Sequence, residues 1–198
     1  FFPNINILPE FNPFLRIGIL ASGEGSNFNA IAREIHQNKL DAEIKLLIVN
    51  NPKCQAIDKA ISLNIPYKVI DHRLYSERSD YDNVISCEFK KVNIEGIVMA
   101  GWMRIVTDTL INSFPGRIIN LHPSILPSYP GTNAIQQALD NGSIITGCST
   151  HYVDINVDSG ELIAQAALPI GVNRNKHELT MRIRRLEHKI LPMSIALA

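Results

Sequence analysis

An amide and an imidazole two residues apart are the side chains of this sequence that most directly suggest chemistry. Asn120 and His122 lie in the apolar run 117–122, which ends at Pro123. Side chains two apart in an extended chain project to the same face, so both can point into one pocket at a strand end. An amide can stabilise a developing oxyanion beside an imidazole that moves a proton, which suits acyl-type transfer. A structural interpretation is also open, with His122 hydrogen-bonded at the strand end and Asn120 capping a turn.

A distant carboxylate could complete this pair. Asp158 stands before Ser159 and Gly160 in a polar turn. If it faces His122, its charge would hold the imidazole and favour the protonated form. An aspartate in such a turn can instead serve only to close an Asx turn, so both roles stay open.

A glycine-rich turn near the start of the chain is a candidate anion site. Residues 22–27, Ser-Gly-Glu-Gly-Ser-Asn, separate a predicted strand at 15–21 from a predicted helix at 28–35. This arrangement aims free backbone N–H groups and the positive end of the helix dipole at an anion. The turn lacks the full GxGxxG spacing and the Walker lysine, so we expect a monophosphate. The alternative is a plain turn with Ser26 or Asn27 as the helix N-cap.

Two other positions could contact a ligand. Trp102, Met103 and Arg104 follow a predicted strand at 96–100, and this mixture of side chains suits a flat heterocycle. The same side chains are equally compatible with ordinary packing in the hydrophobic core, as a core plug. Arg78 lies in the polar stretch 71–79, which we expect to be a loop. It could bind a carboxylate or remain a solvated charge.

Strands and helices alternate along most of the chain. Further strands are predicted at 43–50, 66–70 and 117–122. One further helix is predicted from the turn at 51–52 to residue 63, and others at about 80–92, 107–113 and 134–141. This order predicts an α/β fold with an open, mainly parallel, Rossmann-like sheet and helices on both faces. Strand-like runs at 147–153 and 161–169 predict an antiparallel C-terminal edge. In such sheets ligands bind outside the carboxyl ends of strands, where the glycine-rich turn, residues 101–104 and His122 all fall.

The last segment, about 176–196, is predicted to be an amphipathic helix. Its apolar stripe consists of Leu179, Ile183, Leu186 and Ile190. The residues on its other faces, Arg182, Arg184, Arg185 and Glu187, are solvated by default. Pro192 is expected to kink or interrupt the helix.

Composition restricts the classes of function. The chain has 198 residues, 45% of them hydrophobic, with 19 basic and 19 acidic side chains. This length predicts one domain with a full core, and zero net charge argues against broad binding to nucleic acid or membrane. Cys54, Cys87 and Cys148 form no CxxC pair, which is typical of reduced thiols in a cytoplasmic protein.

Membrane and metal sites are not expected from the sequence. No apolar run approaches the roughly 18 residues that span a bilayer. His151, with His122 and Asp158, lacks a metal-ligand spacing such as HExxH, so we expect no metal. Prolines interrupt residues 1–14, which make a poor signal peptide. We predict an N-terminal extension at 1–14 and a single domain at 15–198.

Five motifs together resemble the phosphoribosylglycinamide formyltransferase family. They are SGEGSN at 22–27, AGWMRIV at 100–106, INLHPSILPSYPG at 119–131, GCSTHYVDINVDSGELIAQ at 147–165 and RRLEHKILP at 184–192. The resemblance covers the chain from about Arg16 to its end. It implies a cytoplasmic enzyme that transfers the formyl group of 10-formyltetrahydrofolate to the amine of glycinamide ribonucleotide in purine biosynthesis. It further implies a monomer or homodimer that needs no metal.

The resemblance also implies roles for individual residues. Asn120, His122 and Asp158 would be catalytic, and the phosphate would be bound by Gly25, Ser26 and Asn27. The ribonucleotide would be faced by Arg184, Arg185, Leu186 and Glu187, with Glu187 as the partner of its amine. The folate donor would be bound by Met103, Arg104, Ile105, Val106, Asn120, Asp154, Ile155, Asn156, Val157 and Asp158, with Arg78 near its glutamyl tail.

Three features depart from the family pattern. The family often has Asn in place of Glu24, and an acid beside a phosphate is unfavourable unless it points away. Residues 132–134 are Thr-Asn-Ala where the family commonly has Leu or Ala and then a polar residue, and residues 1–14 have no counterpart.

Three other functions compete with this one. A formyltetrahydrofolate hydrolase shares the Asn, His and Asp but passes the formyl group to water, and that family carries a regulatory domain ahead of the catalytic one. A methionyl-tRNA formyltransferase carries a C-terminal RNA-binding domain. A ligand-binding α/β module without catalysis is the alternative from another class.

Overall fold

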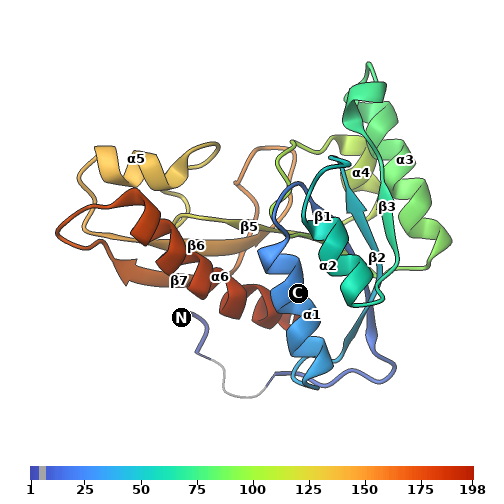
Figure 1. Cartoon of the computed structure of the whole chain (residues 1–198), viewed down its shortest axis with the longest axis horizontal. Helices are drawn as coiled ribbons and strands as arrows, with labels where there is room; N and C mark the ends of the chain where they lie inside the picture. The colour runs from blue at the N-terminus through green and yellow to red at the C-terminus, as the bar shows by residue number, and fades with distance from the viewer. Residues whose placement is uncertain (5–7) are drawn as a thin grey trace.

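One twisted sheet organises the chain (Figure 1). In the computed structural model, which describes residues 1–4 and 8–198, seven strands lie in the order β3-β2-β1-β4-β5-β6-β7. They are β1 Leu15–Ala21, β2 Ala42–Val49, β3 Tyr67–Val69, β4 Gly96–Met99, β5 Ile118–His122, β6 Ile145–Tyr152 and β7 Leu162–Pro169. Strands β1 to β5 pair in parallel, whereas β6 and β7 are antiparallel. The predicted mainly parallel sheet with an antiparallel C-terminal edge is confirmed.

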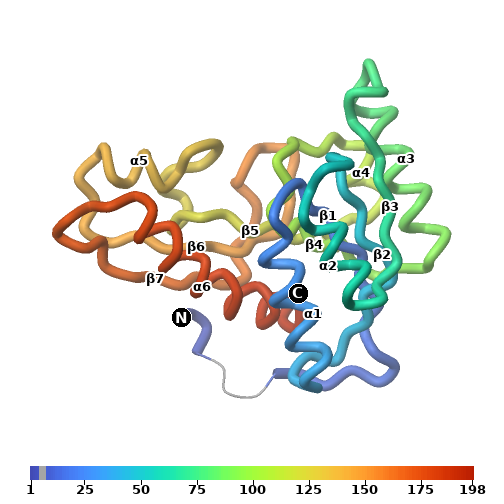
Figure 2. The backbone as a smooth tube through the Cα atoms, viewed as in Figure 1, coloured from blue at the N-terminus to red at the C-terminus, as the bar shows by residue number. Residues whose placement is uncertain are grey.

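Helices cover both faces of this sheet. They are α1 Ser26–His36, α2 Ala56–Ser62, the 3₁₀ helix η1 His72–Leu74, α3 Arg78–Lys91, α4 Asp108–Ser113, α5 Ala134–Asp140 and α6 Lys176–Leu197. Buried residues of α1, α2 and α6 share one hydrophobic cluster, and those of α3 and α4 share a second. The backbone path in Figure 2 shows α1 and α6, the blue and red helices, next to each other.

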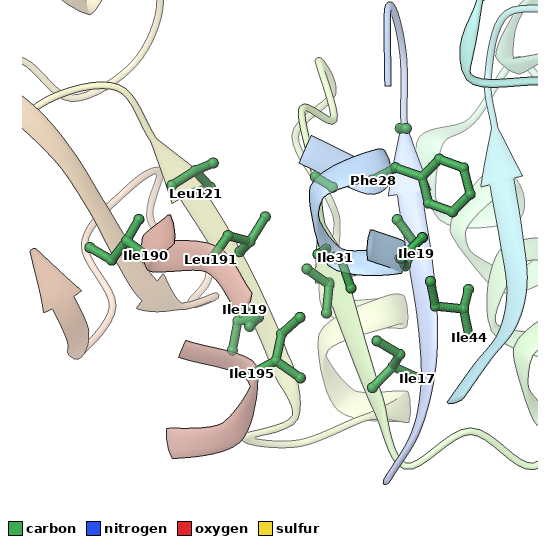
Figure 3. Close-up of a cluster of buried hydrophobic side chains, with 14 of the residues drawn as sticks. Ile17, Ile19, Phe28, Ile31, Ile44, Ile119, Leu121, Ile190, Leu191 and Ile195 are labelled. Atoms are coloured by element: carbon green, nitrogen blue, oxygen red, sulfur yellow. The ribbon is translucent and has the colours of Figure 1, made fainter. Parts of the chain in front are cut away.

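Alternation along β1 explains the two clusters. Ile17 and Ile19 belong to the first cluster and Leu20 to the second, because successive side chains of a strand point to opposite faces. Figure 3 shows the first cluster, where β1, β2 and β5 contribute Ile17, Ile19, Ile44, Ile119 and Leu121, and α1 and α6 contribute Phe28, Ile31, Ile190, Leu191 and Ile195. Full burial of each such side chain stabilises the fold by about 1.5–3 kcal/mol.

Two expectations about helices were wrong. Residues 71–79 are not a plain loop, because η1 occupies His72–Leu74 and α3 already begins at Arg78. The Asp71 carboxylate accepts a hydrogen bond from the backbone N–H of Arg73 and caps η1. Helix α6 continues past Pro192 without interruption to Leu197, since Leu191 and Ile195 on either side are buried against the sheet and hold the last turns in place.

The start of the chain contacts the far edge of the sheet. Phe2 pairs with Gln165 of β7 through two backbone hydrogen bonds of 2.8 Å. The backbone N–H of Phe11 donates to the Asp41 carboxylate at 3.2 Å. The division into an extension at 1–14 and a single domain from residue 15 stays a prediction. Within the described part of the chain, no helix has the length and apolar character needed to cross a membrane.

Candidate active site

Strand β5 brings Asn120 and His122 to one place at its carboxyl end. The two side chains face the same way, as predicted, and both contact Asp158. His122 is buried and Asn120 half-buried. Asn120 has Met99 of β4 on one side and His151 of β6 on the other, so it lies where the parallel and antiparallel parts of the sheet meet.

Asp158 lies at the centre of this group with 9% of its side chain exposed. Its Oδ1 accepts from Asn120 Nδ2 at 3.2 Å, and its Oδ2 accepts from the backbone N–H of Gly131 at 2.8 Å. Oδ2 also lies 3.1 Å from His122 Nδ1. Asp158 adopts a left-handed backbone conformation with φ of 53°, which Asp and Asn tolerate better than most residues. We call Asn120, His122 and Asp158 the candidate catalytic group.

A glycine lets the Asp158 turn lie against β6. A Cβ on Gly160 would be 1.8 Å from the backbone oxygen of Tyr152, so no other residue fits there without a shift. The sequence Asp158-Ser159-Gly160 therefore does more than close a turn, because it directs the carboxylate onto β5.

The surroundings keep Asp158 ionised. Burial acts to raise the pKa of Asp158, but hydrogen bonds from His151 and Gly131 and the charges of His122 and His151 lower it below its usual value overall. The two ring nitrogens of His122 both face oxygen acceptors, Asp158 Oδ2 at 3.1 Å and the Tyr129 carbonyl at 2.8 Å. Both contacts are satisfied only when both nitrogens carry hydrogens, which is the imidazolium form.

The glycine-rich turn forms an open helix start. Gly25 is the N-cap of α1, with φ of 70°, and no side chain caps the helix. A Cβ on Gly25 would lie 2.7 Å from the Cβ of Ala56, so the close approach of α2 requires glycine. The alternative in which Ser26 or Asn27 caps α1 is wrong. Among the described residues no side chain takes the first N–H groups of α1, so they can donate to an anion.

Helix α6 faces this helix start. Asn27 Nδ2 donates to Glu187 Oε2 at 3.1 Å. Glu187 is buried, not solvated as its helix position suggested, and burial raises its pKa although Asn27 and Arg184 oppose the shift. The Glu24 carboxylate turns toward α6, where it lies 2.7 Å from Arg184 Nη1. Lys59 donates to the backbone oxygen of Glu24.

Two loops expose apolar side chains beside the catalytic group. Met103 and Ile105 follow β4, and Ile155 and Val157 precede Asp158; their exposed fractions are 82%, 54%, 61% and 47%. Val153, at the base of the second loop, packs against the cluster that includes Trp102 and Val106 at the base of the first. The loops 103–106 and 154–158 thus offer an apolar lining for a flat ligand.

Comparisons with known proteins show the family of this chain. The family model described as "Formyl transferase" matches residues 15–195. Phosphoribosylglycinamide formyltransferase of Bacillus subtilis is 36% identical over 180 residues, which cover 91% of this chain and 92% of that protein. The chain belongs to the phosphoribosylglycinamide formyltransferase family.

Solved structures and a longer relative show the extent of the family likeness. Glycinamide ribonucleotide transformylase 1 from Symbiobacterium toebii superposes with a TM-score of 0.92 at 32% identity, covering 94% of this chain and 88% of that one. The protein of the same name from Geobacillus kaustophilus gives 0.90 at 35% identity, covering 93% and 100%. The human trifunctional purine biosynthetic protein adenosine-3 is 36% identical over 182 residues, and the chain spans only 18% of its length.

Not every residue that the sequence offered as a ligand contact lies in the site. Trp102 is buried and stacks on Tyr81, with ring centroids 6.3 Å apart, so the core-plug alternative holds for it. Arg185 is exposed on α6, and Arg78 is exposed at the start of α3. Neither touches the catalytic group through a hydrogen bond within the described residues.

His151 is a contact of the catalytic group that the sequence analysis did not predict. Its Nε2 lies 3.3 Å from Asn120 Nδ2 and 3.5 Å from Asp158 Oδ1, while its Nδ1 contacts the Tyr152 carbonyl at 2.7 Å. The signal was the antiparallel register that places His151 opposite Asn120, which requires the strand pairing to be known. In the described residues, no group of three or more His, Cys, Asp or Glu side chains is arranged to hold a metal ion.

Proposed function

We propose that this chain transfers the formyl group of 10-formyltetrahydrofolate to the amine of glycinamide ribonucleotide. The observation that carries the proposal is the convergence of Asn120, His122 and Asp158 in one hydrogen-bonded group at the carboxyl end of β5. An uncapped helix start and an apolar loop pair lie at neighbouring strand ends. A phosphate anchor, a heterocycle slot and an acyl-transfer group are the parts that this reaction needs.

The transfer proceeds by direct attack of the amine on the formyl carbon. The Asp158 carboxylate can only accept hydrogen bonds, so it holds Asn120 with the Nδ2 end toward the group. The second Nδ2 hydrogen of Asn120 faces His151 Nε2 at 3.3 Å, and when the donor is bound Asn120 donates this hydrogen to the forming oxyanion instead. One such donor typically contributes about 10²–10³ in rate.

His122 supplies positive charge beside the same oxyanion. Asp158 and the Tyr129 carbonyl hold the ring in place from both sides. As negative charge develops on the formyl oxygen, the imidazolium stabilises it. The proton lost by the attacking amine reaches the departing folate nitrogen directly or through water that Asp158 helps to order. No covalent intermediate with the enzyme forms.

The two substrates approach from opposite sides of the catalytic group. Gly25, Ser26 and Asn27 bind the phosphate through the free N–H groups of α1, and Arg184 adds a positive charge. Glu187, oriented by Asn27, contacts the ribonucleotide. The loops 103–106 and 154–158 hold the pterin of the donor, with Arg78 near its glutamyl tail.

We also place this activity in the cytoplasm, without a nucleic acid or membrane partner and as a monomer or homodimer. Cys54, Cys87 and Cys148 are free thiols in the structure, which suits a reducing compartment.

Donor consumption with and without the ribonucleotide tests the function. The purified chain is incubated with 10-formyltetrahydrofolate, and loss of the formyl donor is followed by absorbance. Consumption that requires glycinamide ribonucleotide and yields one formylated product per donor supports the proposal. Consumption without the ribonucleotide would indicate a hydrolase, and no consumption under either condition would indicate a binding module.

A further inference from the structure

The turn 129–131, between β5 and α5, contacts two members of the candidate catalytic group through its backbone. The Tyr129 carbonyl lies 2.8 Å from His122 Nε2, and the Gly131 N–H donates to Asp158 Oδ2 at 2.8 Å. A carbonyl oxygen can only accept, so the hydrogen of the first contact is on His122 Nε2. The position of this turn therefore determines how the imidazole and the carboxylate face each other across their 3.1 Å contact.

Tyr129 has an uncommon backbone conformation in this turn. Its φ is 57°, in the left-handed region where a bulky side chain is strained and glycine or asparagine is favoured. Gly131 also has a positive φ, of 78°, which costs a glycine little. Strain of the kind seen at Tyr129 persists only where surrounding contacts hold the residue in place. A tyrosine at this position therefore needs a contact that fixes it.

The side chain of Tyr129 provides such a contact. Its hydroxyl lies 2.7 Å from Ser143 Oγ, and both residues are half-buried. We call this hydrogen bond the tether. Ser143 precedes β6, and the whole of α5 lies between the two residues in the sequence. The tether therefore connects the turn 129–131 directly to the start of β6, across the segment that contains α5.

Ser143 is itself held through its backbone. Its N–H donates to the Ala138 carbonyl of α5 at 3.1 Å, and its carbonyl accepts from Arg174 Nη1 at 3.2 Å. Nη2 of the same guanidinium donates to the Leu139 carbonyl at 2.7 Å. Ser143 is therefore a fixed point to which the turn 129–131 is tied.

We propose that Tyr129 is a positioning residue for the candidate catalytic group and acts through the tether. The tether keeps the Tyr129 carbonyl against His122 Nε2 while the formyl group is transferred. Tyr129 itself moves no proton in this role. The inference deepens the proposed function and rests on it where turnover is measured, whereas the position of the His122 ring can be followed without turnover.

Exchange of the His122 Nε2–H with water tests the tether in the full chain labelled with ¹⁵N. We expect this hydrogen to be protected in the wild type, because His122 is 5% exposed and Nε2 contacts a carbonyl. Tyr129→Phe removes only the hydroxyl and keeps the ring. It should speed the exchange about three- to tenfold, since a hydrogen bond that holds the carbonyl in place is lost.

Turnover measures the consequence for catalysis. Tyr129→Phe should lower kcat about three- to tenfold and leave both KM values unchanged, because the hydroxyl orients the catalytic group and not the substrates. Ser143→Ala removes the other end of the tether and should have an equal effect. The double variant should be no slower than either single variant, since both changes break the same hydrogen bond.

Tyr67→Phe is the matched control, because it deletes the hydroxyl of an exposed tyrosine on β3. It should keep the wild-type exchange rate and kcat. Wild-type exchange of the His122 Nε2–H in Tyr129→Phe would overturn the proposal, as would effects of the two single variants that add in the double variant.

A general loss of stability has a different signature. If the backbone amides of β1 exchange faster in Tyr129→Phe by the same factor as the His122 Nε2–H, the hydroxyl stabilises the whole fold and the positioning role is overturned. A wild-type chain without turnover would overturn the proposed function, and the exchange rates would still decide whether the tether holds the His122 contact.

Discussion

Replacement of Asp158 by Asn isolates the charge that organises the candidate catalytic group. The change keeps the shape of the side chain, and Asn is well suited to the left-handed backbone at this position, where φ is 53°. Its NH₂ end cannot accept hydrogen bonds. In either orientation of the new amide, this NH₂ group faces a hydrogen-bond donor. The donor is Asn120 Nδ2 in one orientation, and the Gly131 N–H together with His122 Nδ1 in the other.

The expected size of the effect follows from these contacts. Each charge-assisted hydrogen bond contributes about 1.5–3 kcal/mol, and the 9% exposure of the side chain leaves little solvent to replace it. We expect Asp158→Asn to lower the free energy of unfolding by about 1–3 kcal/mol near neutral pH, since the new amide recovers part of the loss. Turnover should fall about 10²–10⁴-fold, because His122 loses its charged partner and Asn120 its orientation.

The stability difference should depend on pH in a defined direction. The pKa of Asp158 is lowered in the folded chain, so its stabilisation is present above the unfolded-state pKa and disappears as the pH falls through the folded-state pKa. The difference between wild type and Asp158→Asn should therefore begin to close as the pH falls to about 4.

Steady-state kinetics and urea unfolding of the same preparations measure both effects. Asp140→Asn is the control, because it makes the same chemical change at an exposed carboxylate on α5. It should match the wild type in turnover. Wild-type turnover in Asp158→Asn would refute the role given to this charge, whatever its effect on stability.

Three further changes test the anion site and α6. Glu24→Gln frees Arg184 from its ion pair, so KM for the ribonucleotide should fall about two- to fivefold; an unchanged KM would show that Glu24 does not compete with the phosphate. Gly25→Ala places a Cβ on a left-handed backbone and 2.7 Å from the Cβ of Ala56. It should therefore lower the free energy of unfolding, measured in urea, by about 1–3 kcal/mol and raise the KM for the ribonucleotide. Glu187→Gln removes a carboxyl whose pKa is raised by burial. Above about pH 4.3 the unfolded chain has lost the Glu187 proton while the folded chain still holds it, so the wild type becomes less stable as the pH rises and Glu187→Gln does not. The variant should therefore gain stability relative to the wild type. A difference in the free energy of unfolding that does not change with pH would contradict this.

Much of the fold follows from local patterns in the sequence. Short apolar runs separated by amphipathic segments predict the order of strands and helices, and the polar turns mark the carboxyl ends of the strands. The exceptions are positions where long-range packing outweighs a local signal. Pro192 lies inside α6 because neighbouring residues are buried, and the stretch 71–79 is ordered by the Asp71 cap.

The candidate site divides in the same way. The two-residue spacing of Asn120 and His122 determines their common face, so their pairing was predictable from sequence. The contact of His151 depends on antiparallel register, and the burial of Glu187 depends on how α6 meets α1. Neither the strand register nor the packing of α6 on α1 can be read from the local spacing of residues. The sequence offered Asp158 as a carboxylate facing His122 but left a plain Asx turn open, and the family resemblance implied a catalytic role. The structure adds its contacts with Asn120 and His122.

The rate of formyl transfer within the ternary complex tests the central claim most directly. Asn120→Ala and His122→Ala are saturated with both substrates, and product formation in a single turnover is followed by rapid quench. The account predicts that Asn120→Ala slows transfer about 10²–10³-fold and His122→Ala about 10²–10⁴-fold, while both substrates still bind. A transfer rate equal to that of the wild type in either variant would contradict it.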